Sequence, residues 1–365
     1  MSYITAIGVA NPPTRIAQSA IADFMVRAMQ LGNDDQRKLK TLFRASGISF
    51  RHSVLDDYAR LSDFTFYPNN VEHSLPGTKA RGELYRKHAP ALSTNAIQQA
   101  LNKTTLAATD ITHLITISCT GMYAPGLDID LIKLLGLRTD VQRTCINFMG
   151  CYAAFNGLRL AASVCAADVA AKVLIVCAEL CSLHFQNQNT DDNLLANALF
   201  ADGAAAMLVE ATPRAGINLS LEKFHCSLAF EGEHDMAWQI GDFGFEMQLS
   251  AYVPTIVHAG IRTLAETLLK DTNLSLDSVN YFAPHPGGLK ILTAIESALG
   301  ISKQQHAHAY RVLQQYGNMS SPTVVFVLHE LMKTLSADDN TKTIMSFAFG
   351  PGLTLESMLL KIFSC

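Results

Sequence analysis

Three residues along the 365-residue chain have side-chain types and settings that could serve catalysis. Cys151 follows Gly150 where an apolar run meets a helix-like stretch of small residues, so we expect its thiol near a helix start. The positive end of a helix favours a thiolate, and a glycine permits the sharp backbone turn. Cys151 is therefore a candidate nucleophile, although free cysteines are more often small buried apolar residues.

His285 and Asn318 stand in turns farther along the chain. His285 lies in the run APHPGG (283–288), where prolines fix the backbone and glycines allow close approach; an ordinary turn histidine is the alternative. Asn318 lies in a Gly-containing turn, and on its own it suggests a helix cap together with Ser320 and Ser321. Taken together, Cys, His and Asn provide a nucleophile, a base and a hydrogen-bond donor.

The apolar pattern predicts the elements that must position these residues. Short β-rich runs alternate with longer helical stretches, which is typical of an α/β protein. We expect strands at 3–10, 113–118, 143–148, 172–178, 204–210, 216–224, 279–283, 343–348 and 353–359. We expect helices at 93–101, 151–167, 252–269, 287–299 and 321–335. Proline and glycine in 211–216 divide the chain into two similar halves, 1–210 with the cysteine and 211–365 with the histidine and asparagine.

Composition excludes several classes of protein. With 49 % apolar and 16 % charged residues the chain is not disordered, and a net charge of -4 gives no reason to expect nucleic acid or an anionic membrane as a partner. It contains no apolar stretch of membrane-spanning length and no secretory leader, so we expect a cytoplasmic protein. Most of its eight cysteines are then expected to be free thiols, and their spacing predicts no metal site.

Two reaction classes use a Cys, His and Asn in this order. Papain-like proteases have a similar interval between cysteine and histidine, but their cysteine lies near the mature N-terminus in a different local setting. Here a long α/β pattern precedes Cys151 in Met149-Gly150-Cys151-Tyr152. The second class forms carbon–carbon bonds on thioesters, and the context favours it.

Several motifs in order resemble the condensing enzymes of the thiolase fold, and specifically a type III, chalcone-synthase-like polyketide synthase. The matching runs are GCYAAFNGLRLA (150–161), ALFADGAA (198–205), APHPGG (283–288), YGNMSSP (316–322) and FGPGLTLE (349–356). The resemblance covers nearly the whole chain. It implies a five-layered αβαβα fold built from two similar halves, a homodimer, and malonyl-CoA and acyl-CoA substrates with no bound cofactor.

Within this resemblance Cys151 would accept the starter acyl group as a thioester. His285 would hold the thiolate as an ion pair and then, with Asn318, would stabilise the enolate formed when malonyl-CoA loses CO2, because two fixed donors in a dry cavity stabilise developing charge. The enolate would attack the thioester, over several rounds, before the chain cyclises to a pyrone or a resorcinol.

The resemblance also implies which residues line the pocket. Candidate substrate-binding residues are Phe200, Phe245, Met247, Cys119, Cys181, His184, Gly350, Pro351 and Ser320, and candidate CoA-binding residues are Lys38, Arg44 and Gly287. Phe245 and Met247 are alternative matches for one family position. Cys119, Cys181 and His184 replace threonines of the plant pattern, and Ala124 replaces a methionine from the neighbouring subunit. These changes, and the stretch 238–247, resemble bacterial alkylpyrone and alkylresorcinol synthases and favour a fatty acyl starter.

Other functions compete with this interpretation. A single-step ketoacyl synthase on the same fold would take its substrate from an acyl carrier protein, which could also deliver the starter to a type III enzyme. Hydroxymethylglutaryl-CoA synthase would need a catalytic glutamate that the sequence does not place. A catalytically silent dimeric scaffold is the alternative from another class, and the complete Cys, His and Asn set argues against it.

Overall fold

Nine strands form one curved sheet made of two sub-sheets. The computed structural model describes residues 1–68 and 75–365, and its strand order is β11-β12-β13-β8-β1-β7-β6-β4-β5. The first sub-sheet contains β1 (Tyr3–Ala10), β7 (Asp202–Glu210), β6 (Lys172–Leu180), β4 (His113–Ser118) and β5 (Gln142–Asn147). The second contains β8 (Ile217–Leu228), β13 (Thr354–Ser364), β12 (Thr343–Gly350) and β11 (Tyr281–Pro284). They join where Tyr3 and Ile4 of β1 pair with Ser220 and Leu219 of β8.

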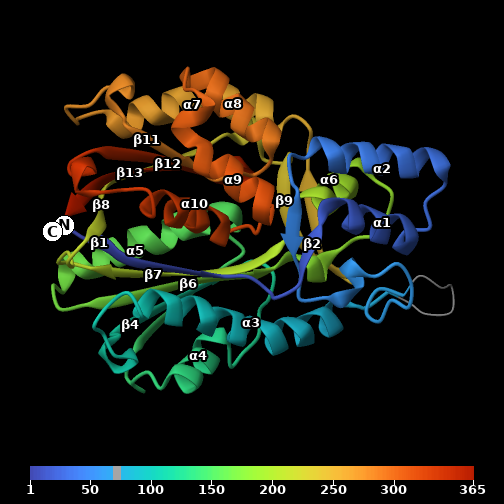
Figure 1. Cartoon of the computed structure of the whole chain (residues 1–365), viewed down its shortest axis with the longest axis horizontal. Helices are drawn as coiled ribbons and strands as arrows, with labels where there is room; N and C mark the ends of the chain where they lie inside the picture. Colours follow the sequence, from blue (N-terminus) through green and yellow to red (C-terminus); the bar gives the residue numbers. More distant parts are fainter. Residues whose placement is uncertain (69–74) are drawn as a thin grey trace.

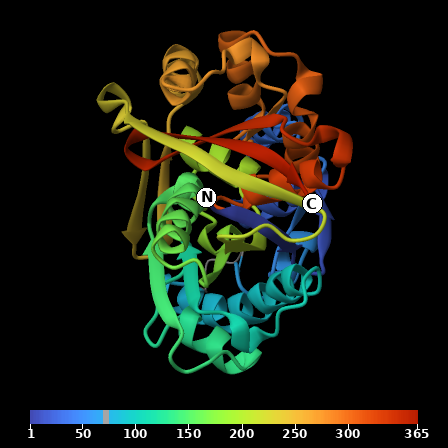
Figure 2. The ribbon, with the colours of Figure 1, turned by 90° about the vertical axis from the view of Figure 1, so that its left-hand side faces the viewer.

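Helices cover both faces of each sub-sheet, which gives five layers (Figures 1 and 2). The outer layer on the first sub-sheet contains α3 (Thr78–Leu101) and α4 (Leu127–Leu135). The central layer contains α5 (Ala153–Ala167) and α10 (Pro322–Met332). The outer layer on the second contains α7 (Val253–Leu269) and α8 (Leu289–Leu299). The first sub-sheet comes from residues before 211 and the second from residues after 216, while the exact boundary between the halves stays a prediction.

Strand β6 explains why the sequence folds into layers. Side chains alternate across a strand, and here both faces are buried, so an almost continuous apolar run results. Ile175 and Cys177 join the central cluster with residues of α5 and α10. Leu174 and Val176 point the other way, into the outer cluster with residues of α3.

All predicted strands are present, whereas the helices were predicted less completely. The helix expected at 93–101 is the second half of α3, which begins at Thr78 and contains Pro90. That predicted start is wrong because α3 packs along β1 and β7, and this packing outweighs the roughly 3 kcal/mol that an interior proline costs. Five further helices were not among those predicted: α1 (Gln18–Ala28), α2 (Asn33–Ala45), α4, α6 (Asp191–Leu199) and α9 (Ala307–Tyr316).

Two small sheets complete the fold beside the central layers. One pairs β2 (Arg15–Ala17) with β3 (Phe50–His52), and the other is a hairpin of β9 (Met236–Gly241) and β10 (Gly244–Leu249). Neither was among the predicted strands. In Figure 1 the hairpin lies beside α6, which contacts β10.

Candidate active site

The turn that carries Cys151 lies between β5 and α5. Phe148 and Gly150 have positive φ values of 59° and 80°, so the chain reverses sharply before α5 begins at Ala153. A Cβ atom at Gly150 would lie 2.2 Å from Cδ of Pro351, a distance that real side chains do not tolerate. Glycine at position 150 therefore lets the nucleophile turn pack against the Pro351 loop.

His285 is buried without a hydrogen-bond partner for its ring. Its backbone N–H donates to the Phe347 carbonyl at 2.7 Å, which fixes the residue at the end of β11. The side chain is 1 % exposed, and among the described residues neither ring nitrogen has a hydrogen-bond partner. Burial lowers the pKa of His285 to about 3, so the ring is neutral near pH 7. Unpaired buried nitrogens are rare and leave the ring free to bind a ligand.

Asn318 is fixed by both its backbone and its amide group. Its N–H donates to the Leu199 carbonyl at 2.9 Å and its carbonyl accepts from Ala201 N–H at 2.8 Å, so it bridges the backbone of Phe200. Oδ1 accepts from the Ser320 N–H at 2.8 Å, and Nδ2 donates to the Gly287 carbonyl at 3.3 Å. An amide nitrogen carries two hydrogens, so a second donor remains; it faces the Cys151 thiol and is available to a ligand carbonyl bound beside that thiol.

The capping interpretation of the asparagine turn is wrong. Helix α10 begins at Pro322, and its N-cap residue, Ser321, makes no side-chain cap hydrogen bond. Instead the Ser321 hydroxyl donates to Oε1 of Glu179 at 2.7 Å. Oε2 of this fully buried carboxylate also accepts from Cys119 N–H at 2.9 Å and from the Thr120 hydroxyl at 2.7 Å. Glu179 therefore ties the loop at 119–120 to the asparagine turn.

Cys151, His285 and Asn318 line one cavity of about 210 Å³. Burial raises the pKa of Cys151 to about 11, although hydrogen bonds with Ser320 and Asn318 lower it. Burial therefore opposes the thiolate that the helix start favours. The cavity accordingly holds a neutral thiol, a neutral imidazole and an oriented amide, three groups that can exchange a proton and bind a carbonyl oxygen.

Most of the predicted pocket residues lie around this cavity. The lining residues among them are Cys119, Cys181, His184, Phe200, Phe245, Met247, Gly287, Ser320 and Pro351. Phe245 and Met247, the alternative matches for one family position, both face it. Gly350 is not a lining residue, but its neighbours Phe349 and Pro351 are.

Two of the predicted CoA-binding residues do not line the cavity. Lys38 lies on the exposed face of α2, where its Nζ pairs with Oδ1 of Asp191 at 2.6 Å. Arg44 is also exposed and donates to the Thr41 hydroxyl at 3.2 Å. Leu42, Ala45 and Ser46 line the cavity instead, because they lie on the inner side of the same segment.

Sequence reasoning missed two contributors to the cavity. The first is part of one face of the β9–β10 hairpin: Met236, Trp238 and Leu249 line the cavity beside the predicted Phe245 and Met247. These residues alternate along their strands, and Met247 pairs with Trp238 while Leu249 pairs with Met236. This alternation of residues along the two strands is the sequence pattern from which the hairpin could have been predicted. The second is Lys290 in the first turn of α8, an exposed lining residue whose ammonium group makes no hydrogen bond or ion pair with another described residue.

The whole chain matches the models of one protein family. The N-terminal domain of chalcone and stilbene synthases matches residues 1–213, and their C-terminal domain matches residues 223–364. The chain therefore belongs to the chalcone and stilbene synthase family and is a type III polyketide synthase. Members of this family act on CoA thioesters without a bound cofactor and are typically dimeric.

Individual relatives agree with this assignment. "Probable polyketide synthase 1" of Dictyostelium discoideum is 34 % identical over 99 % of this chain, which spans only 11 % of that longer protein. "Alpha-pyrone synthesis polyketide synthase-like Pks18" of Mycobacterium tuberculosis is 29 % identical over 99 % of this chain and 91 % of that protein.

Solved structures confirm the expected thiolase-like α/β fold. The C-terminal type III polyketide synthase domain of Steely1, a hybrid synthase from Dictyostelium, has a TM-score of 0.88 at 32 % identity and 99 % coverage of both chains. PKS-I from the brown alga Ectocarpus siliculosus has a TM-score of 0.92 at 31 % identity, with 99 % of this chain and 98 % of that chain covered.

Three further expectations concern groups outside the catalytic set. All eight cysteines are free thiols, where the sequence led us to expect this of most of them. Within residues 1–68 and 75–365, no three metal-ligating side chains are grouped to hold an ion. In the same described segments, no helix combines the length and the apolar composition needed to cross a bilayer.

Proposed function

We propose that this synthase loads a fatty acyl starter from CoA onto Cys151, extends it several times with malonyl-CoA, and releases a pyrone or a resorcinol. The observation that supports this most is the convergence of Cys151, His285 and Asn318, from three separate turns, in one largely apolar cavity. The neutral His285 has no other partner among the described residues.

Loading begins when the Cys151 sulfur attacks the thioester carbonyl of the starter. The thiol proton passes to His285, the bond between the acyl carbon and the CoA sulfur breaks, and the proton leaves with the CoA thiol. Burial keeps each group neutral on its own, but proton transfer creates two opposite charges that stabilise each other strongly in a dry cavity. The start of α5 adds to the stability of the thiolate.

Extension needs a place for negative charge. When malonyl-CoA loses CO2, the electron pair of the broken carbon–carbon bond moves onto the thioester oxygen as an enolate. The free N–H of Asn318 and an N–H of His285 are the donors that we assign to this oxygen. The enolate carbon then attacks the Cys151 thioester, and the thiolate leaves as the carbon–carbon bond forms.

The lining of the cavity supports an acyl chain as the starter. Apolar side chains from several elements surround the space beyond the three catalytic residues: Phe185, Leu195, Leu199, Trp238, Met247, Leu249, Val253 and Phe349. A chain of methylene groups gains about 0.8 kcal/mol for each group buried in such a lining. The similarity to a relative named for alpha-pyrone synthesis favours a pyrone as the product.

We propose that the CoA portion lies at the mouth formed by Ala45, Ser46, Gly287 and Lys290, which all line the cavity. Lys38 and Arg44 do not line the cavity, so we place any contact that they make with CoA outside its mouth. Lys38 is less available for such a contact because it already binds Asp191. An acyl carrier protein is the alternative starter donor.

We further propose a homodimer in the cytoplasm. Strand β5 is an edge of the sheet, and five of its six residues are exposed. An exposed edge strand offers unpaired backbone groups to a second copy. Met122 and Met149 are large exposed apolar residues, and they follow the C-terminal ends of the parallel strands β4 and β5. Eight free thiols suit a reducing compartment.

Product analysis tests the proposed function. The purified protein is incubated with malonyl-CoA and acyl-CoA starters from acetyl through aromatic to long fatty acyl, and products are identified by mass spectrometry. We expect tri- or tetraketide pyrones or resorcinols, formed best from fatty acyl-CoA. Malonyl transfer only from an acyl carrier protein would instead indicate a single-step ketoacyl synthase, and no thioester turnover at all would favour a silent scaffold.

A further inference from the structure

The turn that carries Asn318 has a strained backbone. Gly317 and Ser320 have positive φ values of 69° and 59°, and a residue other than glycine rarely adopts such a conformation. Strain of this kind persists only where the surrounding structure holds the backbone in place, and it is concentrated at functional sites. The contacts that hold this turn therefore decide where the amide group of Asn318 lies.

Thr323 binds all three residues of the turn 318–320. It lies in the first turn of α10, it is fully buried, and it is not a lining residue of the cavity. Its hydroxyl accepts from the Met319 N–H at 2.8 Å and donates to Oδ1 of Asn318 at 3.4 Å. Its own N–H donates to the Ser320 carbonyl at 3.0 Å. A hydroxyl has one hydrogen and two lone pairs, so it can make both of its bonds at the same time.

These bonds fix the direction in which the Asn318 amide points. Oδ1 accepts from the Ser320 N–H at 2.8 Å as well as from the Thr323 hydroxyl. If the amide were turned by 180°, its NH2 group would face the Ser320 N–H, donor against donor. In the observed orientation Nδ2 points to the Gly287 carbonyl, at 3.3 Å, and to the Cys151 thiol.

The two donors to Oδ1 differ in what anchors them. The Ser320 N–H belongs to the strained turn and moves with it. Thr323 belongs to α10, whose Val325 and Phe326 are buried in the central cluster. The backbone of Asn318 is also anchored, through Leu199 and Ala201, but those bonds leave its side-chain torsions free. The Thr323 hydroxyl is thus the contact that ties the amide oxygen to the helix.

We propose that Thr323 is a positioning residue for the extension step. It holds the Asn318 amide where Nδ2 can bind the thioester oxygen of malonyl-CoA while the enolate forms. Loading uses the Cys151 thiol and His285, so it should depend on Thr323 much less than decarboxylation does. The inference rests on the proposed function, in which Asn318 stabilises this enolate.

The test removes the Thr323 hydroxyl with little change of shape. Thr323→Val keeps the branched side chain, and Thr323→Ser keeps the hydroxyl. The matched control is Thr343→Val, because the Thr343 hydroxyl likewise donates to an asparagine, at 3.4 Å from Oδ1 of Asn280. Thr343 is buried at the start of β12 and does not line the cavity.

Two rates are measured for each variant. The first is CO2 release from malonyl-CoA, and the second is single-turnover acylation of Cys151 by the acyl-CoA that the wild type accepts best, followed by intact-protein mass spectrometry. We expect Thr323→Val to slow decarboxylation about tenfold, less than the 10²- to 10³-fold typical of losing such a donor, because the donor is displaced and not removed. Acylation should stay within about twofold of wild type.

The other variants separate the hydroxyl from the fold. Thr323→Ser should restore decarboxylation to within about threefold of wild type, and Thr343→Val should change neither rate. Thr323→Cys, whose thiol is a weaker hydrogen-bond partner, replaces the valine variant if valine prevents folding. Its decarboxylation rate should lie between the rates of wild type and of a tenfold loss.

Failure of the inference differs from failure of the proposed function. If Thr323→Val leaves decarboxylation unchanged, slows both rates equally, or is not rescued by Thr323→Ser, then Thr323 does not position the amide and the inference is overturned. If the wild-type protein releases no CO2 from malonyl-CoA, the proposed function itself fails.

Discussion

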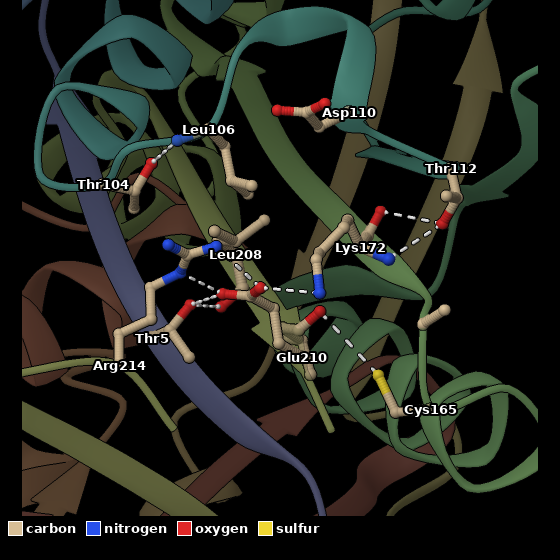
Figure 3. Close-up of polar contacts among 12 residues, drawn as sticks. Thr5, Thr104, Leu106, Asp110, Thr112, Cys165, Lys172, Leu208, Glu210 and Arg214 are labelled. Atoms are coloured by element: carbon tan, nitrogen blue, oxygen red, sulfur yellow. Dashed lines mark hydrogen bonds and ion pairs between the residues drawn. The ribbon is translucent and has the colours of Figure 1, made fainter. Parts of the chain in front are cut away.

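Two buried carboxylates, Glu210 and Glu179, lie in the first half of the chain in opposite settings. Glu210, at the end of β7, binds the Thr5 hydroxyl at 2.7 Å, Arg214 at 2.9 Å and Lys172 at 3.2 Å (Figure 3). Burial raises its pKa, but these partners outweigh burial and lower the pKa overall. Among the described residues Glu179 binds hydroxyl and backbone N–H donors and no cation, so burial leaves its pKa raised.

The histidines repeat the contrast. His306 is fully buried, and its Nε2 lies 2.8 Å from Oε1 of Glu296 although its Nδ1 has no partner, whereas neither nitrogen of His285 has a partner in the described part of the chain. Where ionisable groups are matched by opposite charge, they hold the fold together. Around the cavity, ionisable groups such as Glu179 and His285 have no described partner of opposite charge. This lowers the stability of the fold, and it leaves a group such as His285 able to bind a substrate. Four predictions test this difference between the Glu210 cluster and the cavity.

The largest effect is expected from His285→Gln. Loss of the imidazole removes the proton acceptor and one enolate donor, so malonyl-CoA decarboxylation should fall by about 10²- to 10³-fold. The free energy of unfolding should change by less than about 1 kcal/mol, because the ring has no partner to lose. Decarboxylation is followed by CO2 release and unfolding by urea titration. An unchanged decarboxylation rate would remove His285 from the mechanism.

Glu210→Gln should give the opposite pattern. It leaves Arg214 and Lys172 without their carboxylate, and because both cations are partly exposed we expect a loss of about 2 kcal/mol in the free energy of unfolding. Product formation at a temperature where the variant is folded should stay within about twofold of wild type. Loss of activity with unchanged stability would contradict the assignment of this cluster to the fold.

Acid should destabilise the protein through the buried cavity histidines. The pKa values of His285 and His184 are about 3 in the folded chain and ordinarily 6.5, so between these values the unfolded chain binds protons that the folded chain does not. Stability is then fully present above pH 6.5 and falls as pH falls, by about 2 kcal/mol per histidine at pH 5. In urea titrations, His285→Gln should lose less stability than wild type between pH 7.5 and 5; equal losses would show that His285 does not contribute.

The smallest effect is expected from Lys290, which lines the cavity mouth, compared with Lys38, which lies outside the lining. Lys290→Ala should raise the KM for malonyl-CoA about fivefold, because its free ammonium is available to a phosphate, whereas Lys38→Ala should change it less, since Lys38 already binds Asp191. Malonyl-N-acetylcysteamine, which carries no phosphate, is the matched control substrate. An equal increase in KM for both thioesters would exclude a phosphate contact.

The sequence predicted best what local patterns determine. Strands such as β4 and β6 were found because burial on both faces makes their runs continuously apolar. Cys151, His285 and Asn318 were found because each lies beside a glycine in a turn, and the turns of His285 and Asn318 also contain proline. The orientation of Asn318 could not be read this way, because it depends on Ser320 and on the Gly287 carbonyl.

What the sequence did not predict depends on partners far apart in the chain. Lys38 was expected at the CoA site because the family resemblance places its helix there, with a solvated basic face as the alternative, and Asp191 binds it across 153 positions. The β9–β10 hairpin was missed because its strands have six residues each and its apolar face meets a cavity instead of a core. Helix α3 continues through Pro90 because a sheet, invisible in the local sequence, packs along it.

Intact-protein mass spectrometry tests the central claim most directly. Wild-type protein and Cys151→Ala are each mixed with a fatty acyl-CoA without malonyl-CoA, with Cys365→Ser as the matched control, because Cys365 is an exposed thiol. We predict a single acyl adduct on wild type and on Cys365→Ser, removable by hydroxylamine, and none on Cys151→Ala. An adduct that persists at one site in Cys151→Ala would contradict the account, because another residue would then be the nucleophile.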